Sequence, residues 1–204
     1  MNEEQAVLDF FRKPENLPLG LSVATLMDDI RIGLNSDFWN ALKQRFDSAQ
    51  QRWQIQVTED RNAADMLIGL QFKQQAAQQH GLFPMLEQQY LGGSWRIYIG
   101  LMWQGTPTPE QLGHPAVVSL KLALADAGFS NNASFLAWQW TRFYPRNSDF
   151  LLRCSEQREG LLDEFEKLMS PLLAEHSESI DAANRALNEM PRSMPISLDQ
   201  LRRR

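Results

Sequence analysis

A nine-residue apolar stretch near the middle of the chain, residues 95–103, most constrains its fold. The stretch reads WRIYIGLMW, in which every odd position is apolar and so are Tyr98 and Met102 among the even positions. Side chains alternate between the two faces of a strand, so a strand apolar on both faces is usually covered on both. We therefore expect a central strand of a sheet. The stretch contains no nucleophile, base or metal ligand, so it predicts a core and not a catalytic site.

The composition is that of an ordinary globular protein. Of the 204 residues, 43% are hydrophobic and six are tryptophans. Disorder requires low hydrophobicity and high net charge, so we expect one folded domain with a sizeable core. The net charge of −5 gives no general attraction for phosphate, which leaves only a local basic patch as a route to nucleic acid.

Two features bear on the compartment. The start, Met-Asn-Glu-Glu, does not read as a signal peptide, and no apolar run approaches the length of a membrane span. The single cysteine, Cys154, cannot form an intrachain disulfide. We therefore expect a cytoplasmic protein that does not bind or cross a membrane.

The first 50 residues predict three helices. A short helix begins after Asn2, whose side chain suits the N-cap, and ends at Pro14. A second helix follows Pro18, with apolar residues at three- and four-residue spacing: Leu19, Val23, Leu26, Met27, Ile30 and Leu34. We expect Asn35-Ser36 to end it and Ser36 to cap a third helix. The apolar stripe of that third helix consists of Phe38, Trp39, Leu42 and Phe46.

The rest of the chain mixes strands and helices. Alternation predicts further strands over residues 53–57, 65–72 and 135–144, and a short element over 84–91 before a turn at residues 92–94. A helix is expected over 115–127, ended by Gly128. A long C-terminal helix is expected from about Ser155, with a kink or break at Pro171.

These elements predict an α+β fold. It has N-terminal helices, a mostly antiparallel sheet of about four to five strands, and a long C-terminal helix. Residues 1–190 are expected to form a single domain. Residues 191–204 are expected to form a flexible basic tail that ends in Arg202-Arg203-Arg204.

The sequence offers no familiar metal or phosphate motif. Its three histidines, His80, His114 and His176, lie more than 30 residues apart, so no two have the local spacing of zinc ligands. The glycines at 92 and 93 precede a predicted strand, whereas a phosphate loop follows a strand and opens a helix. We therefore predict no bound metal and no cofactor.

Arginines stand among the aromatic residues of two predicted strands. Arg96 lies in the central strand, and Arg142 follows Trp140 in the aromatic strand over residues 135–144. Surfaces that bind single-stranded nucleic acid interleave cations with exposed rings. Packing of the rings in the core is the competing explanation, because most of them alternate with apolar residues. Arg96, Arg142 and Trp140 are the candidate partner-binding residues.

Short motifs along the chain resemble a known family. They are Phe10-Phe11, the segment PENLP at 14–18, FWNAL at 38–42 and YIGLMW at 98–103, followed by a late acidic helix. Their order resembles the C-terminal part of certain bacterial PD-(D/E)XK nuclease superfamily proteins, where a helix with Phe-Trp-x-x-Leu leads into strands with a Tyr-Ile-Gly-like core. The resemblance covers most of the chain, from Val7 to about Leu187.

The chain departs from that superfamily where catalysis would occur. The resemblance implies an Asp on one strand and a Glu-x-Lys on the next, which hold a divalent metal and assist the attacking water. The nearest counterpart here is Asp65 followed by Gln71-Phe72-Lys73. Glutamine is neutral and replaces a carboxylate ligand poorly. The chain therefore resembles the accessory part of such a protein without its catalytic part.

Three functional hypotheses result. The leading one is a non-catalytic accessory or interaction module of a bacterial nuclease or defence-type system, which binds a protein or nucleic-acid partner. The first alternative is a degenerate Mg²⁺-dependent nuclease whose site uses Asp65, Lys73 and Glu59. The second alternative is an acidic inhibitor that presents ordered carboxylates to a nucleic-acid-binding enzyme. The oligomeric state and the role of residues 202–204 stay open.

Overall fold

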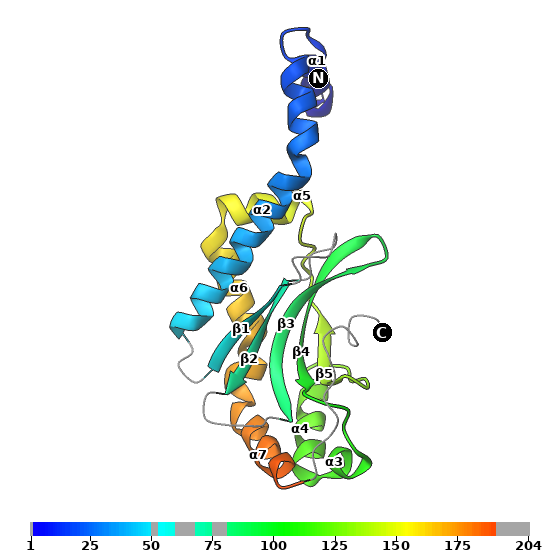
Figure 1. Cartoon of the computed structure of the whole chain (residues 1–204), viewed down its shortest axis with the longest axis vertical. Coiled ribbons are helices and arrows are strands. Elements are labelled where there is room, and N and C mark those ends of the chain that lie inside the picture. Colours follow the sequence, from blue (N-terminus) through cyan, green and yellow to red (C-terminus); the bar gives the residue numbers. More distant parts are fainter. Residues whose placement is uncertain (1, 50–52, 60–67, 75–80, 191–204) are drawn as a thin grey trace.

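The computed structural model describes residues 2–49, 53–59, 68–74 and 81–190, and the predicted tail over 191–204 lies outside these ranges (Figure 1). Two N-terminal helices precede a sheet, and further helices follow strands β4 and β5. The helices are α1 (Glu3–Arg12), α2 (Leu17–Ala49), α3 (Pro109–Gly113), α4 (Pro115–Asp126), α5 (Ser148–Glu156), α6 (Arg158–Ser170), the π-turn η1 (Pro171–Glu175) and α7 (Ser177–Asn188). The strands are β1 (Trp53–Glu59), β2 (Ile68–Gln74), β3 (Leu82–Leu91), β4 (Ser94–Trp103) and β5 (Phe135–Trp140).

The five strands form one antiparallel sheet, which confirms the predicted α+β fold with an antiparallel sheet of four to five strands. Their order in the sheet is β1-β2-β3-β4-β5. Strand β4 contains the apolar stretch over residues 95–103 and lies between β3 and β5. The hairpin between β3 and β4 turns at Gly92 and Gly93, whose φ angles are 60° and 87°. Positive φ at both central residues is the conformation that a two-residue hairpin favours. The expected short element over 84–91 is thus a full strand that pairs with β4.

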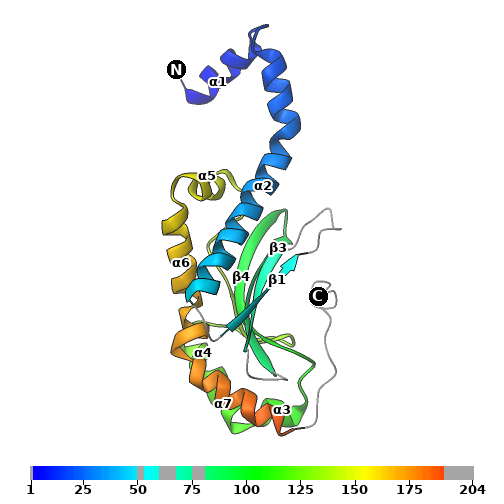
Figure 2. The same ribbon diagram turned by 60° about the vertical axis from the view of Figure 1, so that its left-hand side comes forward.

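Helices cover one face of the sheet (Figures 1 and 2). The second half of α2 packs on this face together with side chains of α4 to α7. The resulting core joins helix residues such as Phe38, Leu42 and Phe165 to strand residues such as Phe72 and Ile99, all nearly inaccessible to solvent. A smaller apolar cluster lies on the opposite face of the sheet and consists of Phe83, Met85, Tyr98, Met102 and Phe135, with Trp138 and Trp140 against it.

The predicted break at Asn35-Ser36 is wrong, because α2 continues through both residues. Ser36, the predicted cap of a third helix, lies inside α2. The side chain of Asn35 is buried, and its Nδ2 donates to Gln88 Oε1 of β3 at 2.9 Å. The indole Nε1 of Trp39, one turn further along, donates to the same oxygen at 2.9 Å. A polar residue that would favour a helix boundary in isolation is held inside the helix by this tertiary hydrogen bond.

The predicted long C-terminal helix from about Ser155 is divided into shorter helices. Helix α5 ends at Glu156, α6 follows at once, and a π-turn over η1 separates α6 from α7. The predicted break at Pro171 is confirmed. Proline cannot donate to the preceding turn, and the His176 amide donates to the Pro171 carbonyl at 3.0 Å, five residues back. The aromatic strand β5 is also shorter than expected, since it ends at Trp140.

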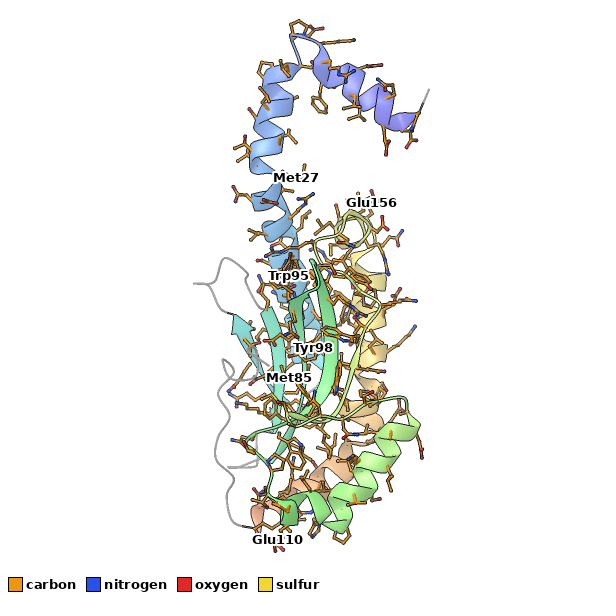
Figure 3. All side chains as sticks on the ribbon, turned by 90° about the vertical axis from the view of Figure 1, so that its right-hand side faces the viewer. Met27, Met85, Trp95, Tyr98, Glu110 and Glu156 are labelled. Carbon is orange, nitrogen blue, oxygen red and sulfur yellow. The ribbon has the colours of Figure 1, made fainter. Side chains whose placement is uncertain are left out.

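The N-terminal helices extend away from the rest of the molecule. We call α1 together with residues 17–34 of α2 the arm, and the remaining described residues the body. The arm projects beyond the sheet, and Met27 lies outside the body on α2 (Figures 2 and 3). Eight large apolar residues of the arm are each 46–61% exposed to solvent: Val7, Leu8, Phe10, Leu17, Leu19, Leu21, Leu26 and Ile30. Among the described residues, no helix is long and apolar enough to span a membrane.

Candidate functional site

The outer edge of β5 is open beyond Trp138. Trp138 exchanges two backbone hydrogen bonds with Ser130, at 2.7 and 2.9 Å, on the side away from β4. Thr141 donates its amide to Ile97 of β4 at 2.8 Å. Because peptide groups alternate in direction along a strand, the amide and carbonyl of Trp140 point outward like those of Trp138. Within the part of the chain that the structure describes, no backbone group pairs with them. We call residues 139–143 the open edge.

The side chain of Trp140 lies on the face of the sheet opposite the core helices. Its ring contacts Tyr98 and Trp138 edge-on, with centroids 5.7 and 5.8 Å away. The guanidinium carbon of Arg96 lies 4.8 Å from the Trp140 ring and 5.3 Å from the Tyr144 ring. Arg96 makes no ion pair with any described carboxylate. The aromatic rings of Trp140 and Tyr144 therefore stabilise the guanidinium of Arg96 by cation–π contact. No described carboxylate neutralises its charge.

A cavity of about 410 Å³ lies beside the open edge, between β5 and α6. It is lined by Gln139, Trp140, Thr141, Arg142, Phe143, Glu164, Lys167 and Leu168. Leu168 and the rings of Trp140 and Phe143 give the cavity an apolar side. Lys167 is exposed and forms no ion pair with any carboxylate in the described ranges. The cavity therefore combines apolar surface, open backbone groups and a positive charge.

Glu164 organises the basic side of this cavity. Arg142 Nη2 donates to Glu164 Oε2 at 2.6 Å, and Arg153 Nη2 donates to Oε1 at 2.7 Å. The hydrogen bond from Arg142 is the main reason that the pKa of Glu164 is lowered from its ordinary value, and Arg153 adds to the effect. The carboxylate thus stays ionised at neutral pH. It fixes the two arginines against the end of β5.

The structure brings the three candidate partner-binding residues together at this edge. Arg96 contacts Trp140, and Trp140 and Arg142 line the same cavity. Both tryptophans of β5 are partly exposed, so these rings are not wholly used in core packing. Arg142 itself is 74% exposed and is tied to Glu164.

The residues of the nuclease alternative are not gathered in the same way. Asp65 lies outside the described residues. Glu59 pairs with Ile68 at one end of the β1–β2 ladder, while Lys73 pairs with Gln54 at the other end. From Gln54 to Glu59 a strand rises roughly 17 Å. The ladder therefore separates Glu59 from Lys73. In the described ranges, no group of three or more His, Cys, Asp or Glu residues is arranged to hold a metal ion.

The inhibitor alternative requires ordered carboxylates that face a partner, whereas acidic groups of α6 lie against an arginine of α2. Arg45 of α2 contacts Glu159, Asp163 and Glu166. The hydrogen bond to Asp163 contributes most to raising the pKa of Arg45. These carboxylates join α6 to α2 and are partly neutralised.

Sequence reasoning did not identify four residues of the site: Tyr144, which follows β5, and Glu164, Lys167 and Leu168 of α6. The sequence pattern places the first near a strand end and the other three on a helix. It does not show which helix lies beside β5. Sequence reasoning also missed Glu87, a buried carboxylate of β3 that accepts a 2.7 Å hydrogen bond from the Tyr98 hydroxyl.

No protein-family model, curated protein or solved structure matched the chain. The case for a function therefore depends on the geometry of the open edge.

Proposed function

We propose that the protein is a non-catalytic interaction module that binds an extended segment of a partner protein along the open edge of β5. The observation that carries this proposal is the unpaired outward peptide of Trp140, which borders the 410 Å³ cavity. Exposed strand edges are templates for added strands, and peptide-binding domains use them in this way. In line with the family resemblance, the partner would be a component of a bacterial nuclease or defence-type system.

The side chains around the edge favour a protein segment that carries both apolar and acidic residues. Main-chain hydrogen bonds to Trp140 would supply affinity, and the cavity beside Leu168 would accept an apolar side chain. Arg96 and Lys167 would attract a carboxylate. Tryptophan and arginine are also the residues most enriched among those that dominate the energy of protein interfaces.

The test begins with a library of displayed seven-residue peptides, selected on the whole protein. Binding of a selected peptide should weaken at least about tenfold in the Trp140→Ala and Arg96→Gln variants. The control variant Tyr90→Ala removes a ring that is 50% exposed near the β3–β4 turn, and it should bind normally. Two sets of N-methylated peptides should separate the two edges of the bound peptide. Methylation of the residues whose N–H groups face β5 should abolish binding, and methylation of the intervening residues should leave it unchanged.

Two outcomes would overturn the proposal. The first is that no selected peptide depends on Trp140 although Trp140→Ala unfolds at the same temperature as the parent protein. The second is that a single-stranded oligonucleotide binds this edge more tightly than any selected peptide. The non-catalytic part would be wrong if the protein cleaved DNA with Mg²⁺ and lost that activity in Asp65→Ala.

A further inference from the structure

We propose that two copies of the chain associate in parallel through a stripe of apolar residues on the arm. The stripe consists of Leu19, Val23, Leu26 and Ile30, which we call the seam. The spacing of four, three and four residues is that of d and a positions over two heptads. Leu19, Leu26 and Ile30 are 56%, 51% and 46% exposed, and Val23 is partly buried. The body therefore leaves most of the seam accessible.

The residue types at these positions favour a second identical helix. The a positions hold the β-branched residues Val23 and Ile30, and the d positions hold Leu19 and Leu26. β-branched residues at a with leucine at d favour two-stranded parallel coiled coils, because each side chain then packs against its own counterpart. The flanking position Asp29 carries the only charge among positions 20, 22, 27, 29 and 34, which are the e and g positions beside the seam. Like-charge repulsion between copies is therefore small.

The seam lies on the side of α2 away from the sheet. Within the body, α2 buries Phe38, Leu42 and Phe46. At 3.6 residues per turn, the seam is rotated roughly 140° from that buried face. The heptad positions that continue the seam into the body are Asp37 and Asn40, and both are exposed and polar. The apolar surface thus stops where the body begins, so a second copy can approach with the two bodies on opposite outer sides.

The apolar area of the arm is enough for a modest dimer. Phe11 of α1 packs against Gly20, next to Leu19, so α1 flanks one end of the seam. Leu19, Leu26 and Ile30 of the seam are about half exposed, and so are Val7, Leu8 and Phe10 of α1. Stable interfaces bury roughly 600–1,000 Å² on each partner, so a contact made by these few side chains belongs at the lower end of that range. The seam itself spans roughly 17 Å of helix. These dimensions predict an association that depends on protein concentration.

The first test measures the mass of the whole protein in solution by light scattering up to about 100 µM, well above the range of a micromolar dissociation constant. The parent protein should reach twice the 23.5 kDa mass of one chain. Leu26→Glu should stay monomeric, because it places a charge at the centre of the seam. Leu21→Glu is the matched control, since Leu21 is 61% exposed on the same helix but points away from the seam. It should dimerise like the parent.

A second test fixes the orientation of the helices. In a parallel pair, Leu19→Cys should form a disulfide with its counterpart under mild oxidation, because equal d positions face each other. In an antiparallel pair, only a mixture of Leu19→Cys and Ile30→Cys chains should cross-link. The parent protein is the control, since its Cys154 is buried.

Monomeric parent protein at every concentration, or a dimer that persists in Leu26→Glu, would overturn the proposal, and antiparallel cross-linking would overturn its parallel form. The circular dichroism spectra of Leu26→Glu and the parent protein should be the same, which would show that the variant is folded. The arm lies away from β5, so either this proposal or the peptide-binding proposal can fail without the other.

Discussion

The two halves of α2 carry similar apolar side chains but place them in opposite environments. Residues 35–49 bury Phe38, Trp39, Leu42 and Phe46 between the sheet and helices α5 and α6. Residues 17–34 leave Leu19, Leu26 and Ile30 about half exposed. Both halves belong to one continuous helix, so helix formation does not explain the difference.

The difference separates folding from association. Apolar residues of the body half stabilise the folded chain, because folding removes them from water. Those of the arm half stabilise the protein only when another surface covers them. Substitutions in the two halves should therefore have different effects on the free energy of unfolding at low protein concentration. The following three predictions test that contrast.

The largest effect should come from the buried aromatic residue of the body half. Phe38 packs edge-on against Phe150 at 5.0 Å and also contacts Phe165. Phe38→Ala should lower the free energy of unfolding by about 3–5 kcal/mol, measured by urea denaturation. Leu26→Ala in the arm should be nearly neutral in dilute solution and destabilising in concentrated solution, where association adds stability by mass action. Equal losses in the dilute samples would contradict the contrast.

An intermediate effect should come from the buried polar contact of the body half. Gln88→Leu removes the acceptor for both Asn35 and Trp39 and leaves two buried donors unpaired. Each such donor costs about 1–3 kcal/mol, so the two together should cost at least about 2 kcal/mol. Thr25→Ala is the comparison in the arm, where the hydroxyl makes an exposed hydrogen bond to the Leu21 carbonyl. Its effect should fall within the error of a thermal or urea unfolding curve.

The smallest effect should come from the ion pairs. Arg45 is 25% exposed and joins α2 to three carboxylates of α6. Arg45→Gln should cost about 1 kcal/mol or less, and salt should reduce that cost. Among the described residues, Arg31 in the arm pairs only with Asp28, which is 87% exposed, so Arg31→Gln should change nothing measurable. Unfolding curves at low and high salt would check both, and a salt-independent loss at Arg45 would show that its packing matters more than its charge.

Local structure was largely predictable from the sequence, because it depends on neighbouring residues. The N-cap at Asn2, the turn at Gly92-Gly93 and the break at Pro171 all follow from backbone chemistry within a few residues. Continuity of α2 through Asn35 was not predictable in this way. It depends on Gln88, which is 53 positions away in the sequence.

The residues of the candidate site also differ in whether the sequence alone could identify them. Arg96 and Trp140 could be selected from the mixture of arginines and rings, and the pairing of Tyr98 with Trp140 then places them together. Lys167 and Leu168 could not be selected. Their role depends on α6 lying beside the last strand, and the helical periodicity of α6 shows which residues share a side but not what that side faces.

The single buried thiol of Cys154 gives the protein an internal probe of motion. Burial raises its pKa to about 11, so it is an unreactive neutral thiol while the native packing holds. A thiol reagent can modify it only when α5 moves away from α2 and the core. The rate of modification in native solution therefore reports how often that part of the body opens, without any introduced label.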